Sequence, residues 1–530
     1  MFRKLSAYLL FVGSLLPLLT VGGEQLILHK EFAGLNIKSA AVIDDWRLQK
    51  YWGGKFSREQ GALKLKPTLE RGKVFGRIKC PYRTGNLSGA KIKLQYKVKG
   101  SGKIRFGAIK TIHDSSDYIW SNLMVLGKDY KNYEFTIDFS GLQLSFVNFI
   151  FEIQGEGEAV IDSMSVKYIG DIGVVINAPA PVMLKDTDTL PDVKFQTNRP
   201  GGKFLFFNSV PEKIQPQFAG SVTADNQGVV TVPGKSLLQD QVVQQLFLIL
   251  EGNAMFQQPV GSGCRRCEVI MDSNKTVAST VITRIPAAEY DAALQAARQV
   301  KLGNIKTILV LADSIWDFDR GTNAADRMNF FLQKAHGKDI KVVNYAVHGD
   351  SIDRITSRFK GNLGKVAHGK NRYSNLKDEQ PDLILIMLGH NDTGASSINN
   401  FAKPAITPDV QKAQYDELLT ALKNKYPQCR IVLLSPLAVN YEGILKRCEA
   451  LKQAGAKVIV RFGDADKVDA FCKTLQETAS QHNLPVFDIY TPTLRLADKA
   501  SFFRPDSVHL SYRGFGLLTQ LVLEELGKLK

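Results

Sequence analysis

The stretch PDLILIMLGHND, residues 381–392, holds an unbroken apolar run that ends in polar residues. Similar runs occur in TILVLADS, IKVVNYAVHGD, CRIVLLSPL and LPVFDIY, with amphipathic segments such as DVQKAQYDELLTALKNKYP between them. Continuous rather than alternating apolar strands, separated by helices, are typical of a parallel sheet covered on both faces. We therefore predict an α/β domain over residues 301–530, with active residues at the carboxyl ends of its strands.

Polar residues follow three of these runs, and each has an ordinary structural explanation. Asp313 or Ser314 could cap a helix that begins after TILVLA. Gly349 could supply a turn with positive φ after the second run. The sequence Gly-His-Asn-Asp at residues 389–392 could form another turn.

The stretch RPDSVHLSYRG, residues 504–514, places a carboxylate three positions before an imidazole. Asp506 and His509 could simply belong to the turn before the last helix. A histidine held by a carboxylate can also act as a general base at neutral pH, provided that a nucleophile and oxyanion donors come from elsewhere in the chain. The strand ends described above offer both.

Taken together, these positions resemble the SGNH hydrolases, also called the GDSL esterase and lipase family. The signature residues of that family are a serine, a glycine, an asparagine and a histidine in four ordered blocks. Ser314 matches the serine, Gly349 matches the glycine, residues 389–392 fit GxND, and residues 506–509 fit the closing DxxH. The resemblance covers about the last 230 residues and implies a three-layer, flavodoxin-like α/β fold.

The resemblance also implies a serine esterase mechanism. Ser314 would be the nucleophile, His509 the general base, and Asp506 the group that holds His509. The backbone NH groups of Ser314 and Gly349 and the side-chain amide of Asn391 would form the oxyanion hole. Three neighbouring residues are interpreted as fixing the loops or contacting substrate: Asp313, His390 and Asp392.

The first block departs from the usual GDS of the family, because Ala312 stands in place of the glycine. Alanine is small, so we expect the change to be tolerated, although it could shift the end of the strand and favours an inactive domain. No GxSxG elbow lies near Ser314, no HExxH is present, and no glycine-rich nucleotide fingerprint follows a predicted strand. We therefore expect neither a metal nor another cofactor.

The first residues, MFRKLSAYLLFVGSLLPLLTVGGEQ, combine two basic residues with an apolar run that ends in small residues. This pattern predicts a secretory signal peptide over residues 1–23. A membrane anchor is the alternative, but Pro17 interrupts a run that is short for a span of about 20 residues. We expect a secreted or periplasmic protein without stable membrane insertion.

Residues 24–170 contain short alternating runs such as KIKLQYKVKG and YEFTIDFSG, which predict an antiparallel β-sandwich. GEGEAVIDSMSVKYIG resembles the last strand of jelly-roll carbohydrate-binding modules, and DDWRLQKYWGGKFSREQGALKLKP resembles their opening strands. Aromatic side chains of such a module could stack on sugar rings, although aromatic residues in a sandwich more often form the core. The candidates for stacking are Trp46, Trp52 and Trp120, with Tyr51 and Tyr118 beside two of them.

The middle of the sequence suggests a supporting role. Residues 171–192 are rich in proline and polar residues and are predicted to form a linker. Runs such as KFLFFNSV and QLFLILEG predict a small β-rich domain over residues 193–284. IPAAEYDAALQAARQV predicts a connecting helix over residues 285–300, with Pro286 near its start.

Composition and charge limit the possible functions. Hydrophobic residues make up 44% and charged residues 23% of the 530 residues, which is typical of a folded protein. The net charge of +16 could attract an acidic polymer, but the basic residues are scattered and form no aromatic-interleaved stripe, so we expect no nucleic-acid partner. Six cysteines are sparse for this length, and the single CxxC at Cys264 and Cys267 favours a local disulfide over zinc.

These features predict an esterase that removes acyl groups, most simply acetyl, from polysaccharide. The piece LGHNDTG also resembles the equivalent block in some carbohydrate acetylesterases of the family. Two enzymatic alternatives are a lipid or lysophospholipid esterase and an acyltransferase that forms the same acyl-enzyme. The third alternative is a catalytically inactive carbohydrate-binding protein.

Overall fold

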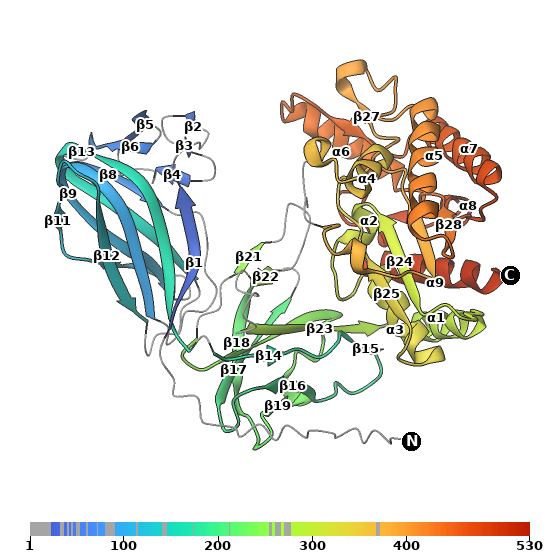
Figure 1. Ribbon diagram of the computed structural model, residues 1–530, viewed down its shortest axis with the longest axis horizontal. Helices are drawn as coiled ribbons and strands as arrows, with labels where there is room; N and C mark the ends of the chain where they lie inside the picture. Colours follow the sequence, from blue (N-terminus) through green and yellow to red (C-terminus); the bar gives the residue numbers. More distant parts are fainter. Residues whose placement is uncertain are drawn as a thin grey trace, which may run out of the picture.

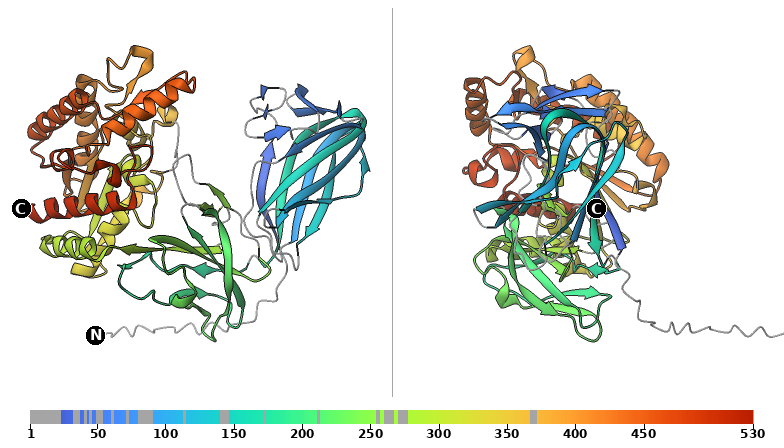
Figure 2. Two further views of the ribbon diagram at one scale, coloured as in Figure 1. Left: turned by 180° about the vertical axis from the view of Figure 1, so that it is seen from behind. Right: turned by 90° about the vertical axis from the view of Figure 1, so that its left-hand side faces the viewer.

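The computed structural model describes residues 23–31, 37–39, 42–43, 46–48, 54–59, 62–70, 73–79, 91–112, 115–139, 146–171, 173–210, 213–253, 257–259, 267–269, 277–366 and 372–529. They form an N-terminal region of strands, a smaller middle region of strands, and a C-terminal α/β domain (Figure 1). In two views from opposite sides, the middle region lies between the other two regions (Figures 1 and 2). The predicted fold class is confirmed, whereas the predicted signal peptide lies outside the described residues except for Gly23.

The N-terminal region is one 13-stranded antiparallel sheet in a sandwich-like arrangement. The order of the strands along the main path is β10-β9-β13-β8-β4-β3-β2, and the remaining strands pair beside this path. The strands are β1 (Gly23–Glu31), β2 (Ile37–Ser39), β3 (Val42–Ile43), β4 (Trp46–Leu48), β5 (Lys55–Glu59), β6 (Ala62–Lys66), β7 (Thr68–Glu70), β8 (Lys73–Lys79), β9 (Lys91–Ile112), β10 (Ser115–Trp120), β11 (Met124–Val125), β12 (Lys131–Asp138) and β13 (Phe146–Gly170).

Two long strands, β9 and β13, connect this region from end to end. Residues 103–111 of β9 pair with 146–154 of β13, and residues 91–101 pair with 158–169. Where the two halves meet, Gly100 and Gly157 have φ values of 145° and 135°. A Cβ atom on Gly100 would lie 2.0 Å from the carbonyl oxygen of Glu158, so the close approach of the strands at this bend requires glycine.

The described part of the middle region contains a three-stranded sheet β14-β16-β19, a five-stranded sheet β15-β23-β20-β17-β18 and the two-stranded sheet β21-β22. The first two pack against each other. Their apolar side chains share one core, which includes Phe195, Phe204 and Leu246. The elements are β14 (Ile176–Asn177), β15 (Val182–Lys185), β16 (Val193–Thr197), β17 (Lys203–Val210), β18 (Lys213–Thr223), β19 (Val229–Val232), η1 (Gly234–Ser236), β20 (Val243–Leu250), β21 (Gln257–Pro259), β22 (Cys267–Val269) and β23 (Val277–Ile285).

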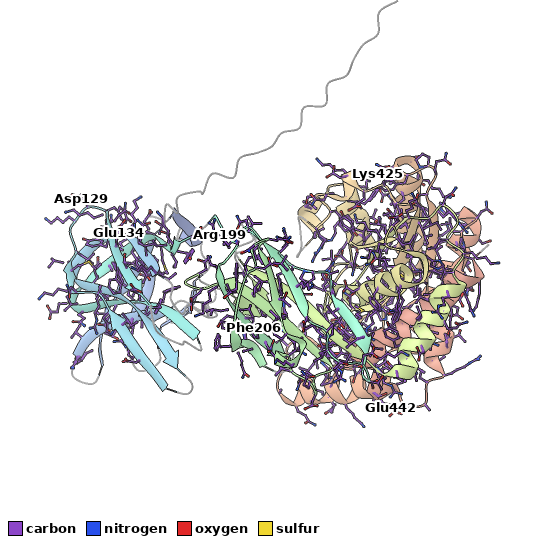
Figure 3. All side chains as sticks on the ribbon, turned by 90° about the horizontal axis from the view of Figure 1, so that it is seen from below. Asp129, Glu134, Arg199, Phe206, Lys425 and Glu442 are labelled. Atoms are coloured by element: carbon purple, nitrogen blue, oxygen red, sulfur yellow. The ribbon has the colours of Figure 1, made fainter. Side chains whose placement is uncertain are left out.

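The stretch predicted as a linker, residues 171–192, contains two of these strands. β14 pairs with β16, and β15 pairs in parallel with β23. The prolines and polar residues that suggested a linker lie mostly in the turns between these short strands. Arg199, labelled in Figure 3, lies on the side of the middle region that faces the N-terminal region. It donates to both carboxylate oxygens of Asp171 at 2.7 Å.

The α/β domain contains a five-stranded parallel sheet in the order β25-β24-β26-β28-β30. This order is that of flavodoxin-like folds, with the first strand in the interior of the sheet. The strands are β24 (Thr307–Ala312), β25 (Lys341–Asn344), β26 (Leu383–Met387), β28 (Arg430–Leu434) and β30 (Val486–Phe487), and β27 (Ala395–Ser396) pairs with β29 (Val460–Arg461) in a separate small sheet.

Helices cover both faces of this sheet. Alternate side chains of a strand therefore enter two different cores, one on each face. Val310 belongs to the core under α1, α3 and α9, whereas Leu309 and Leu311 belong to the core under α4, α5 and α7. The helices are α1 (Ala287–Gln299), α2 (Ser314–Asp317), α3 (Ala324–His336), α4 (Ile352–Phe359), α5 (Pro408–Lys425), α6 (Tyr441–Gln453), α7 (Ala465–His482), α8 (Tyr490–Leu494) and α9 (Tyr512–Lys528). The 3-10 turns are η2 (Leu363–Lys365), η3 (Leu376–Asp378), η4 (Ser397–Asn399) and η5 (Lys499–Phe502).

The helix predicted to connect the domains, α1, is part of the α/β domain. Its residues Tyr290, Ala293 and Ala297 are buried in the core shared with α3 and α9. Pro286 stands at its N-terminal boundary, where a missing backbone NH costs nothing. No helix among the described residues combines the length and the apolarity needed to cross a bilayer.

Candidate active site

Ser314 lies where the interior strand β24 gives way to helix α2. The strand ends at Ala312, and Ser314 is the first residue of the helix. Asp313 caps the helix, since its Oδ1 atom accepts a hydrogen bond of 3.0 Å from the backbone NH of Ile315. The cap fixes the turn that presents Ser314, whose exposed fraction is only 6%.

Ser314, His509 and Asp506 form a continuous chain of hydrogen bonds. The Oγ atom of Ser314 lies 3.0 Å from Nε2 of His509, and Nδ1 of the same ring lies 2.7 Å from Oδ2 of Asp506. With the proton on Nδ1 directed at the carboxylate, Nε2 is free to accept the proton of the serine hydroxyl. Ser314, near the start of the predicted domain, and His509, near its end, thus lie at the distance expected of a nucleophile and its general base.

The carboxylate of Asp506 is held in its ionised form. Burial favours the neutral acid, but the hydrogen bond and charge of His509 and the backbone NH groups of Val508 and His509 outweigh it, so the pKa of Asp506 lies well below its usual range. The two backbone bonds to Oδ1 measure 3.0 Å and 2.9 Å. Oδ2 is therefore left for the imidazole, which it orients and stabilises in the protonated form.

Gly349 and Asn391 lie on the two loops that follow β25 and β26, the strands on either side of β24. Gly349 has a φ of 77°, a conformation that favours glycine. The side-chain amide of Asn391 donates a hydrogen bond of 2.9 Å to the backbone carbonyl of Asp350, which ties the two loops together. An amide nitrogen carries two hydrogens, so Asn391 keeps one for an oxyanion.

His390 and Asp392 are both buried and fix the third loop. The ring nitrogens of His390 lie 3.2 Å from Oδ2 of Asp313 and 3.2 Å from the carbonyl oxygen of Leu437. Asp392 accepts hydrogen bonds from the backbone NH groups of Ile352, at 2.9 Å, and Gly389, at 3.1 Å.

Burial raises the pKa of Asp392 to about 7, and the charge of Asp313 acts in the same direction against the two backbone bonds. The residues interpreted as loop-fixing therefore contact the loops, and His390 also lines a pocket described below.

Asp317 and Arg320 are site residues that the sequence analysis missed. Asp317 accepts hydrogen bonds from the backbone NH of His348, at 2.9 Å, and from the His348 ring, at 3.1 Å. Arg320 binds the same carboxylate at 2.8 Å and donates to the backbone carbonyls of Asn344 and Ala346, both at 2.9 Å.

These bonds fasten the loop that carries Gly349 to the segment that begins with Ser314. The only sequence signal was the position of Asp317 three residues after the serine, which a turn also explains.

Ala312, the departure from GDS, fits its position. Its side chain is fully buried in the core of the α/β domain. Its carbonyl oxygen accepts a hydrogen bond of 2.9 Å from the backbone NH of Val347, which keeps the second loop in register with the end of β24. The alanine therefore does not displace Ser314 from His509.

Of the predicted sugar-stacking residues, Trp120 is the one whose side chain the structure describes. Trp52 and the side chain of Trp46 lie outside the described residues. Trp120 lies on β10 of the sandwich, parallel to Tyr118 with ring centres 5.6 Å apart, and the guanidinium of Arg105 lies 4.0 Å from its ring centre. One face of Trp120 is thus already in contact with a cation.

Within the described residues, no group of three or more histidine, cysteine or acidic side chains could hold a metal ion. Cys429, Cys448 and Cys472 are free thiols in the α/β domain, and the side chains of Cys264 and Cys267 lie outside the described part of the chain.

Residues 310–517 match the model of the GDSL-like Lipase/Acylhydrolase family. The α/β domain is therefore a GDSL-like lipase/acylhydrolase domain, and the resemblance seen in the four sequence blocks is confirmed. A domain of this family supports a carboxylic ester hydrolase. No curated protein matches the chain.

Solved structures similar to the chain align with less than half of it. A lipase/acylhydrolase from Enterococcus faecalis is 22% identical, with 43% of this chain and 98% of that chain covered and a TM-score of 0.31. A member of the lipolytic protein G-D-S-L family from Veillonella parvula is 17% identical, with coverages of 42% and 100% and a TM-score of 0.28. The psychrotrophic esterase EstA from Pseudoalteromonas sp. is 14% identical, with coverages of 42% and 97% and a TM-score of 0.29.

Proposed function

We propose that this protein is a serine esterase that removes acetyl or other short acyl groups from polysaccharide outside the cytoplasm. The observation that carries the proposal is the chain from Asp506 through His509 to Ser314, with distances of 2.7 Å and 3.0 Å. Ala312, the one feature that favoured an inactive domain, does not disturb these hydrogen bonds.

The reaction would proceed in two displacements. His509 takes the proton of Ser314 as the hydroxyl oxygen attacks the ester carbonyl, and the negative charge on the carbonyl oxygen is received by backbone NH groups and the amide of Asn391. Collapse of this intermediate breaks the bond to the alcohol, which leaves with the proton from His509. Water then attacks the acyl-enzyme with His509 again as base, releasing the carboxylic acid and free Ser314.

The polysaccharide is favoured by the rest of the chain. The N-terminal sandwich-like region has the strand-rich character of carbohydrate-binding modules, and the first residues have the pattern of a signal peptide. The net charge of +16 would favour an acidic polymer. No cofactor is needed for the proposed reaction.

Hydrolysis of phenyl acetate by the purified protein tests the serine mechanism. Ser314→Ala should lower kcat/KM by at least about 1,000-fold, because the nucleophile itself is removed. Ser480→Ala, on the exposed face of α7, is the matched control and should retain full activity. Equal activity of Ser314→Ala and the wild type would remove Ser314 from the mechanism.

Product analysis tests the substrate class. We expect faster release of acetate from acetylated polysaccharide than of fatty acid from phospholipid. A preference for the phospholipid would favour the lipid esterase instead. Transfer of the acyl group to an added sugar alcohol, in place of its release to water, would identify an acyltransferase.

A further inference from the structure

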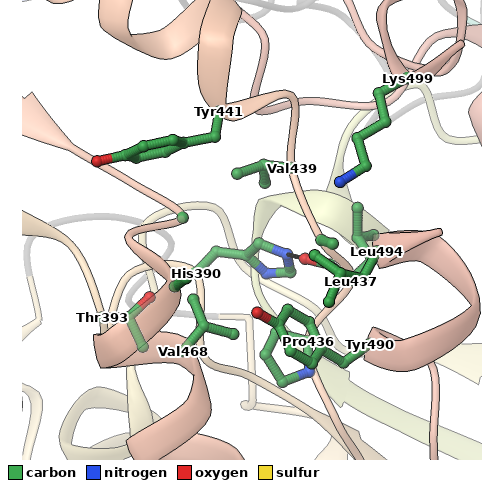
Figure 4. Close-up of a pocket in the computed structure, with 13 residues that line it drawn as sticks. His390, Thr393, Pro436, Leu437, Val439, Tyr441, Val468, Tyr490, Leu494 and Lys499 are labelled. Carbon is green, nitrogen blue, oxygen red and sulfur yellow. Dashed lines mark hydrogen bonds between the residues drawn. The ribbon is translucent and has the colours of Figure 1, made fainter. Parts of the chain in front are cut away.

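A pocket of about 180 Å³ lies beyond the carboxyl ends of β28 and β30, beside the candidate active site. Its walls are mainly apolar, and they include Pro436, Leu437, Val439, Val468 and Leu494. His390, whose Nδ1 atom contacts Asp313, also lines the pocket (Figure 4). The volume is below the range of about 300–1,000 Å³ for drug-sized ligands, so the pocket suits one ring or a short chain.

One cation enters this apolar pocket. Lys499, at the start of η5, is half-buried, and its amino group points toward the middle of the pocket (Figure 4). Burial lowers the pKa of Lys499, and no acidic side chain acts in the opposite direction. Among the described residues, no carboxylate forms an ion pair with it, whereas the adjacent Asp498 lies 3.6 Å from Arg513.

A charged ammonium beside apolar walls is costly until an anion pairs with it. A ligand with a carboxylate on an otherwise apolar ring or short chain would satisfy both features of the pocket. The single positive charge of Lys499 balances the single negative charge of a carboxylate, whereas a phosphate group carries about −1.5 to −2 at pH 7, so a carboxylate is the better match.

The position of the pocket indicates which part of an ester it would hold. The backbone NH of Asn440, in the loop that forms one wall, donates to the carbonyl oxygen of Ser507 at 3.2 Å. Ser507 is two residues from His509, and His509 protonates the leaving alcohol in the proposed reaction. Of the proposed oxyanion donors, Gly349 comes from a loop that does not line the pocket, whereas the loop of Asn391 contributes His390 and Thr393 to its wall. The contact between Asn440 and the segment that carries His509 therefore assigns the alcohol part of the ester to this pocket.

We propose that this pocket binds a carboxylate carried by the alcohol part of the ester, with Lys499 as the residue that recognises the charge. This inference rests on the proposed esterase function and narrows its substrate to an acidic one, such as an acylated sugar acid. Lys499 is thus a specificity-determining residue, and the apolar walls hold the ring or chain that bears the carboxylate.

The test compares three esters with the full-length protein. Phenyl acetate is neutral, 4-acetoxybenzoate carries a carboxylate on the alcohol part, and monophenyl succinate carries one on the acyl part. For each variant, the ratio of kcat/KM for a charged ester to that for phenyl acetate is measured, so that changes in general activity cancel. The variants are Lys499→Met, Lys499→Arg, and Lys446→Met as the control on the exposed face of α6.

The expected result is a fall of about tenfold in the ratio for 4-acetoxybenzoate in Lys499→Met, mainly through KM. Lys499→Arg should keep most of the ratio, and Lys446→Met should not change it. An unchanged ratio in Lys499→Met would overturn the proposal. A fall for monophenyl succinate alone would overturn it too, because the pocket would then hold the acyl part.

Calorimetric binding of 4-hydroxybenzoate to Ser314→Ala separates this inference from the proposed function. If no ester is hydrolysed but 4-hydroxybenzoate binds and Lys499→Met weakens it about tenfold, the pocket assignment stands and the esterase proposal fails. If esters are hydrolysed and binding does not depend on Lys499, the esterase stands and the pocket assignment fails.

Discussion

The sandwich-like region and the α/β domain both bury charged side chains, but they do so in different places. Glu152 lies in the middle of β13, 1% exposed, and receives Arg77 from β8 and Arg105 from β9 at 2.7 Å and 2.6 Å. The buried acids Asp313 and Asp317 of the α/β domain instead follow the end of a strand. The carboxylate of Glu152 inside the sheet is paired with arginines of adjacent strands. The carboxylates of Asp313 and Asp317 at the strand end instead hold the loops around Ser314.

Among the four variants that test this comparison, the largest expected change in activity comes from Asn391→Ala, in a loop at the end of a strand of the α/β domain. Removing one oxyanion donor should lower kcat for phenyl acetate by about 100-fold to 1,000-fold, equivalent to about 2.7–4 kcal/mol. The thermal stability should fall only slightly, because the lost hydrogen bond is partly exposed. Asn399→Ala, at an exposed position of η4, is the control, and the same kcat in both variants would exclude Asn391 from the oxyanion hole.

Glu152→Gln should have the opposite profile. Loss of the carboxylate removes the buried ion pairs of Glu152 with Arg77 and Arg105, so the sandwich should lose about 3 kcal/mol of stability. Ester hydrolysis by the α/β domain should not change. Glu156→Gln, in the exposed bend of β13, is the matched control in thermal melts. An unaltered melting profile would show that the buried charges of the sandwich are not structural.

Asp317→Asn tests a charge at a strand end through its pH dependence. Burial favours the neutral acid, but hydrogen bonds from His348 and the charge of Arg320 lower the pKa of Asp317 to about 2. The ionised carboxylate therefore contributes about 2 kcal/mol above the unfolded pKa of about 4, and this is lost as the pH falls toward 2. The stability deficit of Asp317→Asn relative to the wild type should thus shrink between pH 5 and pH 2, as measured by urea unfolding; a constant deficit would contradict this role.

Arg320→Met should have the smallest effect of the four. The guanidinium positions the loop of Gly349 through two backbone carbonyls without contacting substrate, so we expect about a tenfold lower kcat with little change in KM. Arg447→Met, exposed on α6, serves as the control. A change confined to KM would show that Arg320 binds substrate directly.

The α/β fold could be predicted because its signal is local. Runs such as LILIM at β26 bury every residue, and parallel strands bring their carboxyl ends to one edge, so the order of polar residues along the chain already indicated a shared site. His509 could be assigned to Ser314, 195 residues away, only through the resemblance to a known family.

Other features depend on contacts that no local pattern contains. Arg320 reaches the carbonyls of Asn344 and Ala346, which belong to a different strand and loop. The apolar residues of 171–192 are interrupted by prolines and polar residues, yet β15 forms because β23 offers a parallel edge about 100 residues later in the chain. The orientation of Lys499 into a pocket likewise depends on the packing of loops distant in sequence.

The most direct test of the central claim is covalent labelling of Ser314 by an alkyl phosphonate ester, followed by intact mass and peptide mapping. A phosphonate that reacts only with an activated serine should add once, at Ser314, in the wild type. Labelling should be lost in His509→Ala, since the general base is gone. Labelling at another serine, or undiminished labelling of Ser314 in His509→Ala, would contradict the proposed nucleophile and base.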